Sequence, residues 1–363
     1  MINPSSLEPA VSPLRFQCIE ACRFLARLTL ILLPVLVCYA LLEAIAWRVG
    51  QTWSMQHVAQ WQGDDPTRTY RGGDPHYIAP YKMARVRQRK PDVIMLGSSR
   101  SNYVRAEMFK PYSFQNCSLT AWTFNQYLRF LQTISSDGYA PKALFFNLDY
   151  WMFNDEYNRA WDDLFSEPPP THWQELKTVI DELLREPANF LSRVFRAENA
   201  KGVYALRFGL GFQVDGSLAV SGTPDANPAR LMGDYHVGAV PFVFGDRFNP
   251  EQMNSFERFV DFAKSKNIAL IGIQFPFYAG ILDALDRTSQ GLWHQFNSDN
   301  SRSYIESKGV VFFDFANMPE YRDKPEAFMN SGHAASDVIE DVMNRVLEDS
   351  RVSTLLPQLK ASR

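Results

Sequence analysis

Apolar residues along the chain form one long run near the N-terminus and several short runs further on. The long run covers residues 28–47 (LTLILLPVLVCYALLEAIAW), about the length that a helix needs to cross a bilayer. Only Arg48 follows it closely, whereas three arginines precede it: Arg15, Arg23 and Arg27. The positive-inside tendency therefore predicts a single-pass protein of the bacterial inner membrane, with a cytoplasmic N-terminus and a periplasmic or extracellular main domain.

Small and charged residues near the end of this run allow more than one interpretation. Ala44-Ile45-Ala46 resembles a signal-peptidase site, but the long leader before the run favours an uncleaved anchor. Glu43 either reaches the headgroup region or pairs with a polar group on a partner's helix. Its place four residues before the end of the run favours the headgroup region.

The short apolar runs of the exported part alternate with segments of helical pattern. A helix with one apolar face is predicted over residues 251–266, before the fourth run. The five runs are predicted as strands over residues 93–96, 114–119, 143–148, 268–275 and 310–315. Continuous apolar strands that alternate with helices predict an α/β fold, with a doubly wound, mostly parallel, five-stranded sheet covered on both faces.

The same pattern divides the chain into segments. The segments are a cytoplasmic tail (1–27), the transmembrane helix (28–47), a polar linker (48–90), the α/β domain (91–350) and a C-terminal tail (351–363). The stretch between the third and fourth strands is too long for a simple crossover and predicts an insertion at about 155–250 that roofs or borders the site. Within it we predict a helix over 172–195 and a hairpin at 214–217.

Composition narrows the classes of function. The net charge of -3 and the pI near 6.1 give no field that would attract nucleic acid, so we expect no nucleic-acid partner. Cys117 is alone in the exported part, so no intrachain disulfide can form there. Cys18 and Cys22 are spaced one helical turn apart, as metal ligands can be, but no third or fourth ligand is near them in the sequence. We therefore predict neither a catalytic metal nor a cofactor.

Two polar segments carry the candidate chemistry. Leu96-Gly97-Ser98-Ser99 lies where the first strand ends and a helix begins, a place that suits either a nucleophilic Ser99 or an ordinary helix N-cap. His333 follows the fifth strand, so the topology brings it to the same sheet edge. The two residues together predict a nucleophile and its general base more strongly than either residue does alone.

Aromatic residues at the ends of the third and fourth strands are candidates for substrate binding. Tyr150 and Trp151 follow the third strand, and Tyr278 follows the fourth. They form either a wall for a sugar ring or acyl chain, or the closing layer of the core, which is the commoner arrangement. Arg100 is the corresponding charged candidate beside Ser99.

Four short blocks together resemble the SGNH (GDSL) hydrolase superfamily. The blocks are 92–101 with Gly97-Ser98-Ser99, 116–121, 147–149 and 330–333. The N-terminal anchor and the Gly-Ser-Ser form resemble the membrane-tethered members that modify envelope glycans, such as the D-alanine transfer protein and the alginate acetylation proteins. The resemblance covers 91–123, 142–153 and 268–347.

This resemblance implies a site in which Ser99 attacks an acyl group and His333 takes the proton. The oxyanion donors would come from the Ser99 N–H, from the second block at Ala121 and from the third block. The chain departs from the family pattern at three positions. Ala121 replaces a glycine, Asp149 stands where the third block has asparagine, and Asn330 replaces the triad aspartate. Asp149 then serves either as the acid of the triad or as the partner of Arg100 in a structural ion pair, which we favour.

Two classes of function follow. The first is an O-acyltransferase or esterase that acts on an exported polysaccharide or acyl ester through Ser99 and His333. The second is a weakly active or inactive protein of the same fold that binds a glycan or docks on a multi-pass membrane O-acyltransferase. Hydrogen bonding between Ser99 and His333 with a carboxylate behind the imidazole would favour the enzyme, whereas a separated pair or a filled pocket would favour the scaffold.

Overall fold

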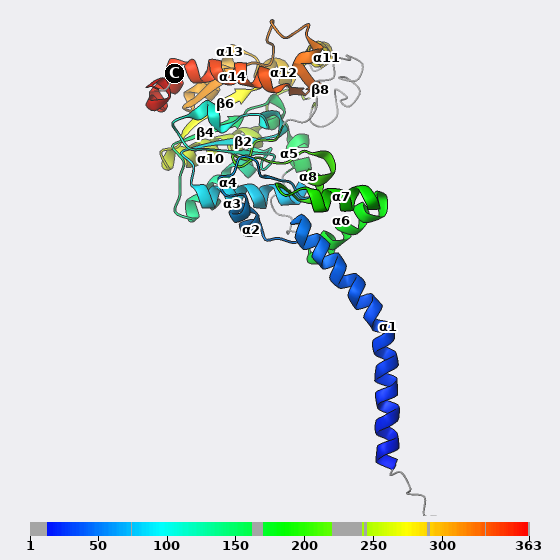
Figure 1. Cartoon of the computed structure of the whole chain (residues 1–363). Coiled ribbons are helices and arrows are strands. Elements are labelled where there is room, and N and C mark those ends of the chain that lie inside the picture. The colour runs from blue at the N-terminus through cyan, green and yellow to red at the C-terminus, as the bar shows by residue number, and fades with distance from the viewer. Residues whose placement is uncertain are drawn as a thin grey trace, which may run out of the picture.

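The architecture of the chain was obtained as a computed structural model (Figure 1). It describes residues 13–73, 75–161, 170–219, 242, 245–288, 291–330 and 332–361. The start of the predicted cytoplasmic tail, part of the predicted insertion and the last two residues therefore lie outside the described residues.

A long N-terminal helix, α1 (Pro13–Val49), extends away from the rest of the molecule (Figure 1). The segment Glu20–Val49 of this helix contains an apolar stretch with a mean hydropathy of 2.4. Other parts of the chain do not cover this stretch. The helix is thus long and apolar enough to cross a membrane. It contains the whole predicted span and continues for 15 residues before residue 28.

A five-stranded parallel sheet forms the centre of the outer domain. The strands are β2 (Val93–Gly97), β3 (Phe114–Ser118), β4 (Ala143–Asn147), β6 (Ala269–Gln274) and β7 (Val310–Asp314). Their order is β3-β2-β4-β6-β7, and every neighbouring pair is parallel. The prediction of an α/β fold with a mostly parallel five-stranded sheet is therefore confirmed.

Helices cover both faces of this sheet, which explains why most residues of β2, β4, β6 and β7 are apolar, whereas β3 (FQNCS) also buries polar side chains. Successive side chains of a strand point to opposite faces. Leu96 and Phe146 join one core cluster, whereas Met95 and Phe145 join the other. The first cluster is covered by α3 (Ile78–Arg89), α4 (Phe124–Ser136), α10 (Pro250–Ser265), α12 (Gly291–Phe296) and α13 (Asp299–Ser307). The second is covered by η3 (Ala106–Phe109), α14 (Ser336–Glu348) and α15 (Ser350–Leu355).

Two segments expected to be a linker and a tail are folded. Between α1 and the sheet lie α2 (Met55–Gln62), β1 (Thr69–Tyr70), η1 (Pro75–Tyr77) and α3. Met83 and Val86 of α3 pack into the core, so this stretch belongs to the domain. At the C-terminus, α15 and η7 (Pro357–Ala361) bury Val352, Leu356 and Leu359. In both cases a few buried side chains within a polar sequence attach the segment to the core.

The described part of the insertion forms α5 (Asp155–Trp161), α6 (His172–Arg185), α7 (Pro187–Arg196), β5 (Ala200–Lys201) and α8 (Val203–Phe208). The helix predicted over 172–195 is thus two helices, because Pro187 lacks an N–H and starts a new helix. Leu176 and Val179 of α6 pack against Ala46 and Val49 of α1. The described helices α6 and α7 of the insertion therefore support the end of α1, whereas its residues Tyr157 and Phe242 border the site.

The predicted hairpin at 214–217 corresponds to a turn closed by a bridge between Phe212 and Leu218. The turn lies against the edge strand β3, where the Asn116 N–H donates to the Asp215 carbonyl at 2.6 Å. The remaining elements lie at the carboxyl edge of the sheet or follow it. They are η2 (Ser99–Ser101), η4 (Tyr150–Phe153), α11 (Ala279–Thr288), η6 (Pro325–Ala327), β8 (Phe328–Asn330) and β9 (His333–Ala334).

Candidate functional site

Ser99 lies in a sharp turn at the carboxyl end of β2. Gly97 ends the strand with φ 153°, and a Cβ there would lie 2.1 Å from Asn147 Oδ1. Only glycine therefore fits between the strand and the Asn147 side chain. Ser98 then caps η2, with its Oγ accepting from the Arg100 N–H at 3.4 Å. This turn places Ser99 at the edge of the sheet where parallel α/β folds bind ligands.

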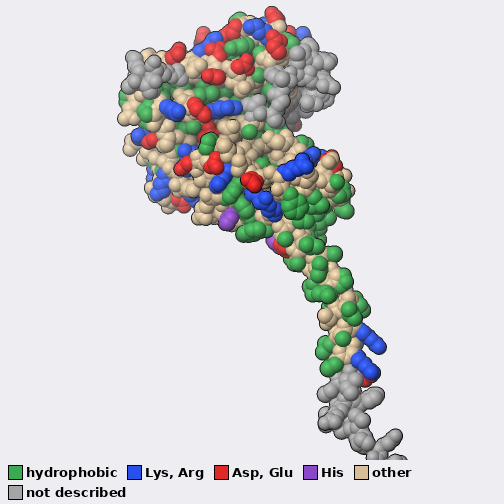
Figure 2. Space-filling model, in the orientation of Figure 1, with side chains coloured by type: hydrophobic (Ala, Val, Ile, Leu, Met, Phe, Trp, Pro, Cys, Tyr) green, Lys and Arg blue, Asp and Glu red, His purple; other side chains and the backbone are tan. Residues whose placement is uncertain are grey.

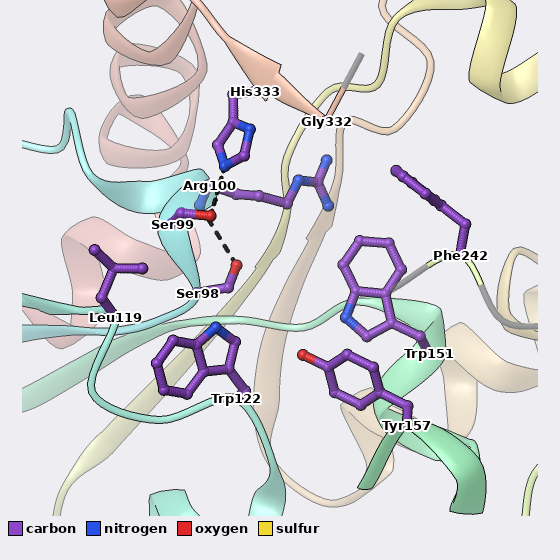
Figure 3. A pocket seen from close by; sticks show the side chains of 10 residues that line it. All are labelled: Ser98, Ser99, Arg100, Leu119, Trp122, Trp151, Tyr157, Phe242, Gly332 and His333. Atoms are coloured by element: carbon purple, nitrogen blue, oxygen red, sulfur yellow. Dashed lines mark hydrogen bonds between the residues drawn. The ribbon is translucent and has the colours of Figure 1, made fainter. Parts of the chain in front are cut away.

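The structure brings Ser99 and His333 together, although 234 residues separate them in the sequence. Ser99 Oγ lies 2.5 Å from His333 Nε2. His333 comes from β9, which pairs antiparallel with β8 after the last strand of the sheet. Figure 3 shows the imidazole directed at the serine hydroxyl. The contact has the geometry that a serine nucleophile and its general base require.

Asn330 lies behind the imidazole, on the side away from Ser99. His333 Nδ1 is 2.7 Å from Asn330 Oδ1, and the Gly332 N–H donates to the same oxygen at 3.1 Å. Two neighbouring N–H groups require an acceptor, so the amide presents its oxygen to the ring. The Nδ1 atom of His333 is therefore protonated, and its Nε2 carries the lone pair that faces the Ser99 hydroxyl.

The His333 ring is a weak base. Burial of the imidazole, together with the nearby positive charge of Arg100, lowers the pKa of His333 to about 4. Both effects disfavour the imidazolium. The ring is consequently neutral at pH 7 and ready to accept a proton, but it holds that proton less strongly than a histidine backed by a carboxylate.

Arg100 and Asp149 form a buried ion pair beside Ser99. The Arg100 guanidinium also donates to the Phe275 and Pro276 carbonyls and lies 3.8 Å from the centroid of the Phe277 ring. Burial raises the pKa of Asp149, and Arg100 opposes this by favouring the charged carboxylate. The pair connects the segments that follow β2, β4 and β6.

Asp149 therefore has the structural role that we favoured from the sequence, and not that of the acid behind His333. Its side-chain partners are Arg100 and Asn147, whereas the Nδ1 atom of His333 faces Asn330. Asp149 also does not line the cavity beside Ser99. An oxyanion that forms in this cavity consequently does not face a free carboxylate.

The cavity beside Ser99 and His333 measures about 250 Å³. The residues that line this cavity are Ser98, Ser99, Arg100, Leu119, Trp122, Trp151, Tyr157, Phe242, Gly332 and His333. In Figure 3 the serine and histidine occupy one side, and the rings of Trp122, Trp151 and Tyr157 face them from the other. The cavity thus combines one small polar group with a mostly aromatic wall, as small-molecule sites commonly do.

Among the residues predicted to bind substrate, Arg100 and Trp151 line the cavity, but Tyr150 and Tyr278 do not. Tyr150 is buried, and its ring packs against Trp151 and Trp293. Tyr278 packs against Phe328. These two tyrosines close the core at the ends of strands, the alternative that their positions left open.

The oxyanion donors expected from the sequence differ in their placement. Among the described residues, no hydrogen bond occupies the backbone N–H of Ser99, which lies in the wall of the cavity. Ala121 is fully buried and does not line the cavity. The backbone N–H groups of Leu119 and Trp122 donate to the Gly97 carbonyl and to Gln126 Oε1 respectively. Ser99 is therefore the better supported donor.

Several residues of the site were not predicted. Trp122 follows the second block by one position, so its place next to a predicted loop was an available signal. Tyr157 and Phe242 belong to the insertion, where nothing in the sequence indicates the direction of a side chain. Asn147 donates from Nδ2 to Ser98 Oγ at 3.3 Å and so supports the serine turn from the end of β4.

No protein-family model, curated protein or solved structure matches this chain. Within the described part of the chain, no group of three or more His, Cys, Asp or Glu side chains is placed to hold a metal ion.

Proposed function

We propose that this protein is a membrane-anchored serine esterase or O-acyltransferase of SGNH type that acts on an exported polysaccharide. One observation carries the proposal. Ser99 Oγ, His333 Nε2, His333 Nδ1 and Asn330 Oδ1 form a continuous hydrogen-bonded chain that opens on an aromatic cavity. Such a chain polarises a serine hydroxyl for attack on a carbonyl carbon.

In the proposed reaction, His333 Nε2 takes the hydroxyl proton of Ser99 while the Ser99 oxygen attacks the carbonyl carbon of an ester. The Ser99 N–H stabilises the negative charge that develops on the carbonyl oxygen. The tetrahedral intermediate then expels the alcohol, which receives the proton from His333. A glycan hydroxyl or a water molecule next gives its proton to His333 and attacks the carbonyl carbon of the acyl-Ser99. His333 then returns this proton to Ser99 Oγ as the acylated glycan or the free acid is released.

Asn330 determines how well this sequence of steps works. Its oxygen keeps the Nδ1 atom of His333 protonated, so the reactive tautomer is in place. An amide has no charge to stabilise the imidazolium, and Arg100 disfavours it. We therefore assign the protein a slow turnover whose limit is the basicity of His333.

Helix α1 and the cavity wall support the proposed location and substrate class. We assign α1 as an uncleaved anchor in the inner membrane, with the domain on the periplasmic or extracellular side, as the arginine distribution indicates. The indole rings of Trp122 and Trp151 offer flat apolar faces to a sugar ring or an acyl group. A multi-pass O-acyltransferase of the same membrane is the partner that would supply the acyl group.

The presence of Asn330 in place of a triad aspartate also favours a second candidate function. Asn330 instead of a carboxylate, together with a His333 of low basicity, fits a protein that retains the fold but has lost efficient chemistry. In that case the cavity would bind a glycan or an acyl group, and the domain would present it to a membrane acyltransferase.

Hydrolysis of a small acetyl ester by the purified protein separates the two candidates. The enzyme proposal expects measurable turnover for the wild type, loss of it in Ser99→Ala, and an increase of about tenfold or more in Asn330→Asp, because the carboxylate would stabilise the imidazolium. Ser265→Ala, which changes an exposed serine of α10, is the matched control and should keep the activity. Equal background rates in all four proteins would exclude the enzyme and leave the scaffold.

A further inference from the structure

A second cavity, which we call the Trp pocket, lies where α1 enters the outer domain. It measures about 330 Å³ and is lined by Trp47, Arg48, Trp53, Trp61, Glu198 and Lys201. The ring of Trp53 lies 5.8 Å from that of Trp47 and 5.8 Å from that of Trp61. The pocket is thus formed by the last turn of α1, the adjoining α2 region and the region around β5, and it takes no part in the chemistry at Ser99.

Lys201 is an unusual residue in this pocket because its ammonium group is buried without a counter-ion. Its exposed fraction is 4%, and its Nζ donates to the Arg48 carbonyl at 2.9 Å. No carboxylate of the described residues forms an ion pair with it; Glu198 is exposed and acts on it only at longer range. Buried lysines are normally paired, so this one lacks a negative charge.

Arg48 adds a second cation to the same pocket. It is exposed, and no hydrogen bond or ion pair occupies its guanidinium among the described residues. Burial and the Arg48 charge both lower the pKa of Lys201, as expected when two cations share a pocket. An anion between Arg48 and Lys201 would satisfy both groups.

The place of the pocket indicates where such an anion would come from. His172 at the start of α6 lies 2.7 Å from Glu43, one turn before Trp47, so the domain rests directly on the end of α1. Trp173 and Phe195 of the neighbouring α6 and α7 are 62% and 68% exposed. Figure 2 shows hydrophobic side chains, with Lys and Arg among them, over the helices next to α1. Exposed tryptophans beside cations are typical of the headgroup region of a bilayer.

We propose that the Trp pocket binds the phosphate of an anionic phospholipid headgroup, held between Arg48 and Lys201, in the leaflet that meets the C-terminal end of α1. The indole rings of Trp47, Trp53 and Trp61 contact the glycerol and the upper acyl chain. The bound lipid fixes the orientation of the domain on the membrane. The inference rests on the proposed anchoring by α1 and is independent of the chemistry at Ser99.

The competing explanation is that Lys201 only caps α1. Its bond to the Arg48 carbonyl satisfies a free acceptor in the last turn of the helix, where a cation is favourable. A cap needs Lys201 but not the guanidinium of Arg48, which forms no bond within the described protein. The two explanations therefore differ in what they expect of Arg48.

The test is native mass spectrometry of the full-length protein in detergent, titrated with phosphatidylglycerol, phosphatidylcholine or inorganic phosphate. We expect one phosphatidylglycerol to bind preferentially, and its affinity to fall about tenfold or more in both Arg48→Gln and Lys201→Met, since each removes a charged hydrogen-bond donor. Lys177→Met is the matched control, because Lys177 is an exposed lysine of α6 that is paired with Asp181, and should bind as the wild type does.

Equal binding of phosphatidylglycerol by wild type, Arg48→Gln and Lys201→Met would overturn the proposal, as would loss of binding in Lys201→Met alone. Equal binding of inorganic phosphate would overturn the assignment to a lipid. Extraction of the protein from membranes by alkaline carbonate would overturn the anchoring on which the proposal rests. Unchanged lipid binding in Ser99→Ala, which we expect, would separate a failure at this pocket from a failure of the proposed enzyme.

Discussion

Ser99 and Arg100 are neighbours in η2 but belong to two very different assemblies. On the Arg100 side, a buried guanidinium meets the buried Asp149 carboxylate and two backbone carbonyls. On the Ser99 side, a hydroxyl, a neutral imidazole and an amide form a chain without any formal charge. The carboxylate at this edge of the sheet thus stabilises the arrangement of the strands, while the base has only an amide behind it.

This difference indicates how a serine–histidine pair can keep its geometry while the basicity of its histidine is lowered. The positions of Ser99 and His333 depend on the turn at Gly97 and on β9, whereas the basicity of His333 depends on the charges around it. Geometry and basicity can therefore be changed separately by substitution. The following predictions use that separation, beginning with the largest effect.

Asp149→Asn should destabilise the domain by about 3–5 kcal/mol, because it leaves the buried Arg100 without a counter-charge. Chemical denaturation of the full-length protein, followed by tryptophan fluorescence, measures the change in the free energy of unfolding. Asp181→Asn is the control, since its ion pair with Lys177 is exposed and should contribute no more than about 1 kcal/mol. Similar small losses in both variants would show that Asp149 does not hold the sheet edge together.

The pH dependence of turnover should report the protonation of His333. The reaction needs the neutral ring, so the rate should rise with pH through about 4 and level off near neutral pH. In Asn330→Asp, the new carboxylate favours the imidazolium and should move this rising limb upward by about 1–3 pH units. A rising limb near the ordinary histidine pKa of 6.5 in the wild type would contradict the buried, carboxylate-free site.

The lowered pKa of His333 also predicts how this residue affects the stability of the fold. Its folded pKa is lowered, so the unfolded chain binds more protons between pH 6.5 and 4. The contribution of His333 to stability is therefore complete above pH 6.5 and is lost as the pH falls to about 4, by no more than about 3 kcal/mol. His333→Gln should remove this part of the acid sensitivity in denaturation curves measured across that range.

Much of the fold could be predicted because most residues of β2, β4, β6 and β7 are buried and apolar, although β3 also buries polar side chains. The folded linker and C-terminal segment could not, since their few buried side chains are spaced among polar residues. Arg85 of α3 is an example, because it is buried yet donates to backbone carbonyls of Ala59 and Gly63. A sequence pattern cannot distinguish such a buried arginine from a solvated one.

For the site, the sequence placed Ser99 and His333 at one edge, since both follow strands of a parallel sheet. The sequence could not show whether Asp149 pairs with His333 or with Arg100, because both pairings need a carboxylate at the same position at the end of β4. The cavity wall was predicted only in part. Trp151 lines it while the adjacent Tyr150 turns into the core, and the two directions depend on the short helix η4.

The most direct test of the central claim is covalent labelling of the full-length protein with a fluorophosphonate, with the labelled residue identified by peptide mass spectrometry. The account predicts labelling of Ser99 in the wild type, faster labelling in Asn330→Asp, and loss of labelling at this site in Ser99→Ala and His333→Ala, because phosphorus is attacked only by a serine that a base activates. Ser98, one residue away, should stay unlabelled throughout. Absence of label on Ser99 in both the wild type and Asn330→Asp would contradict the account.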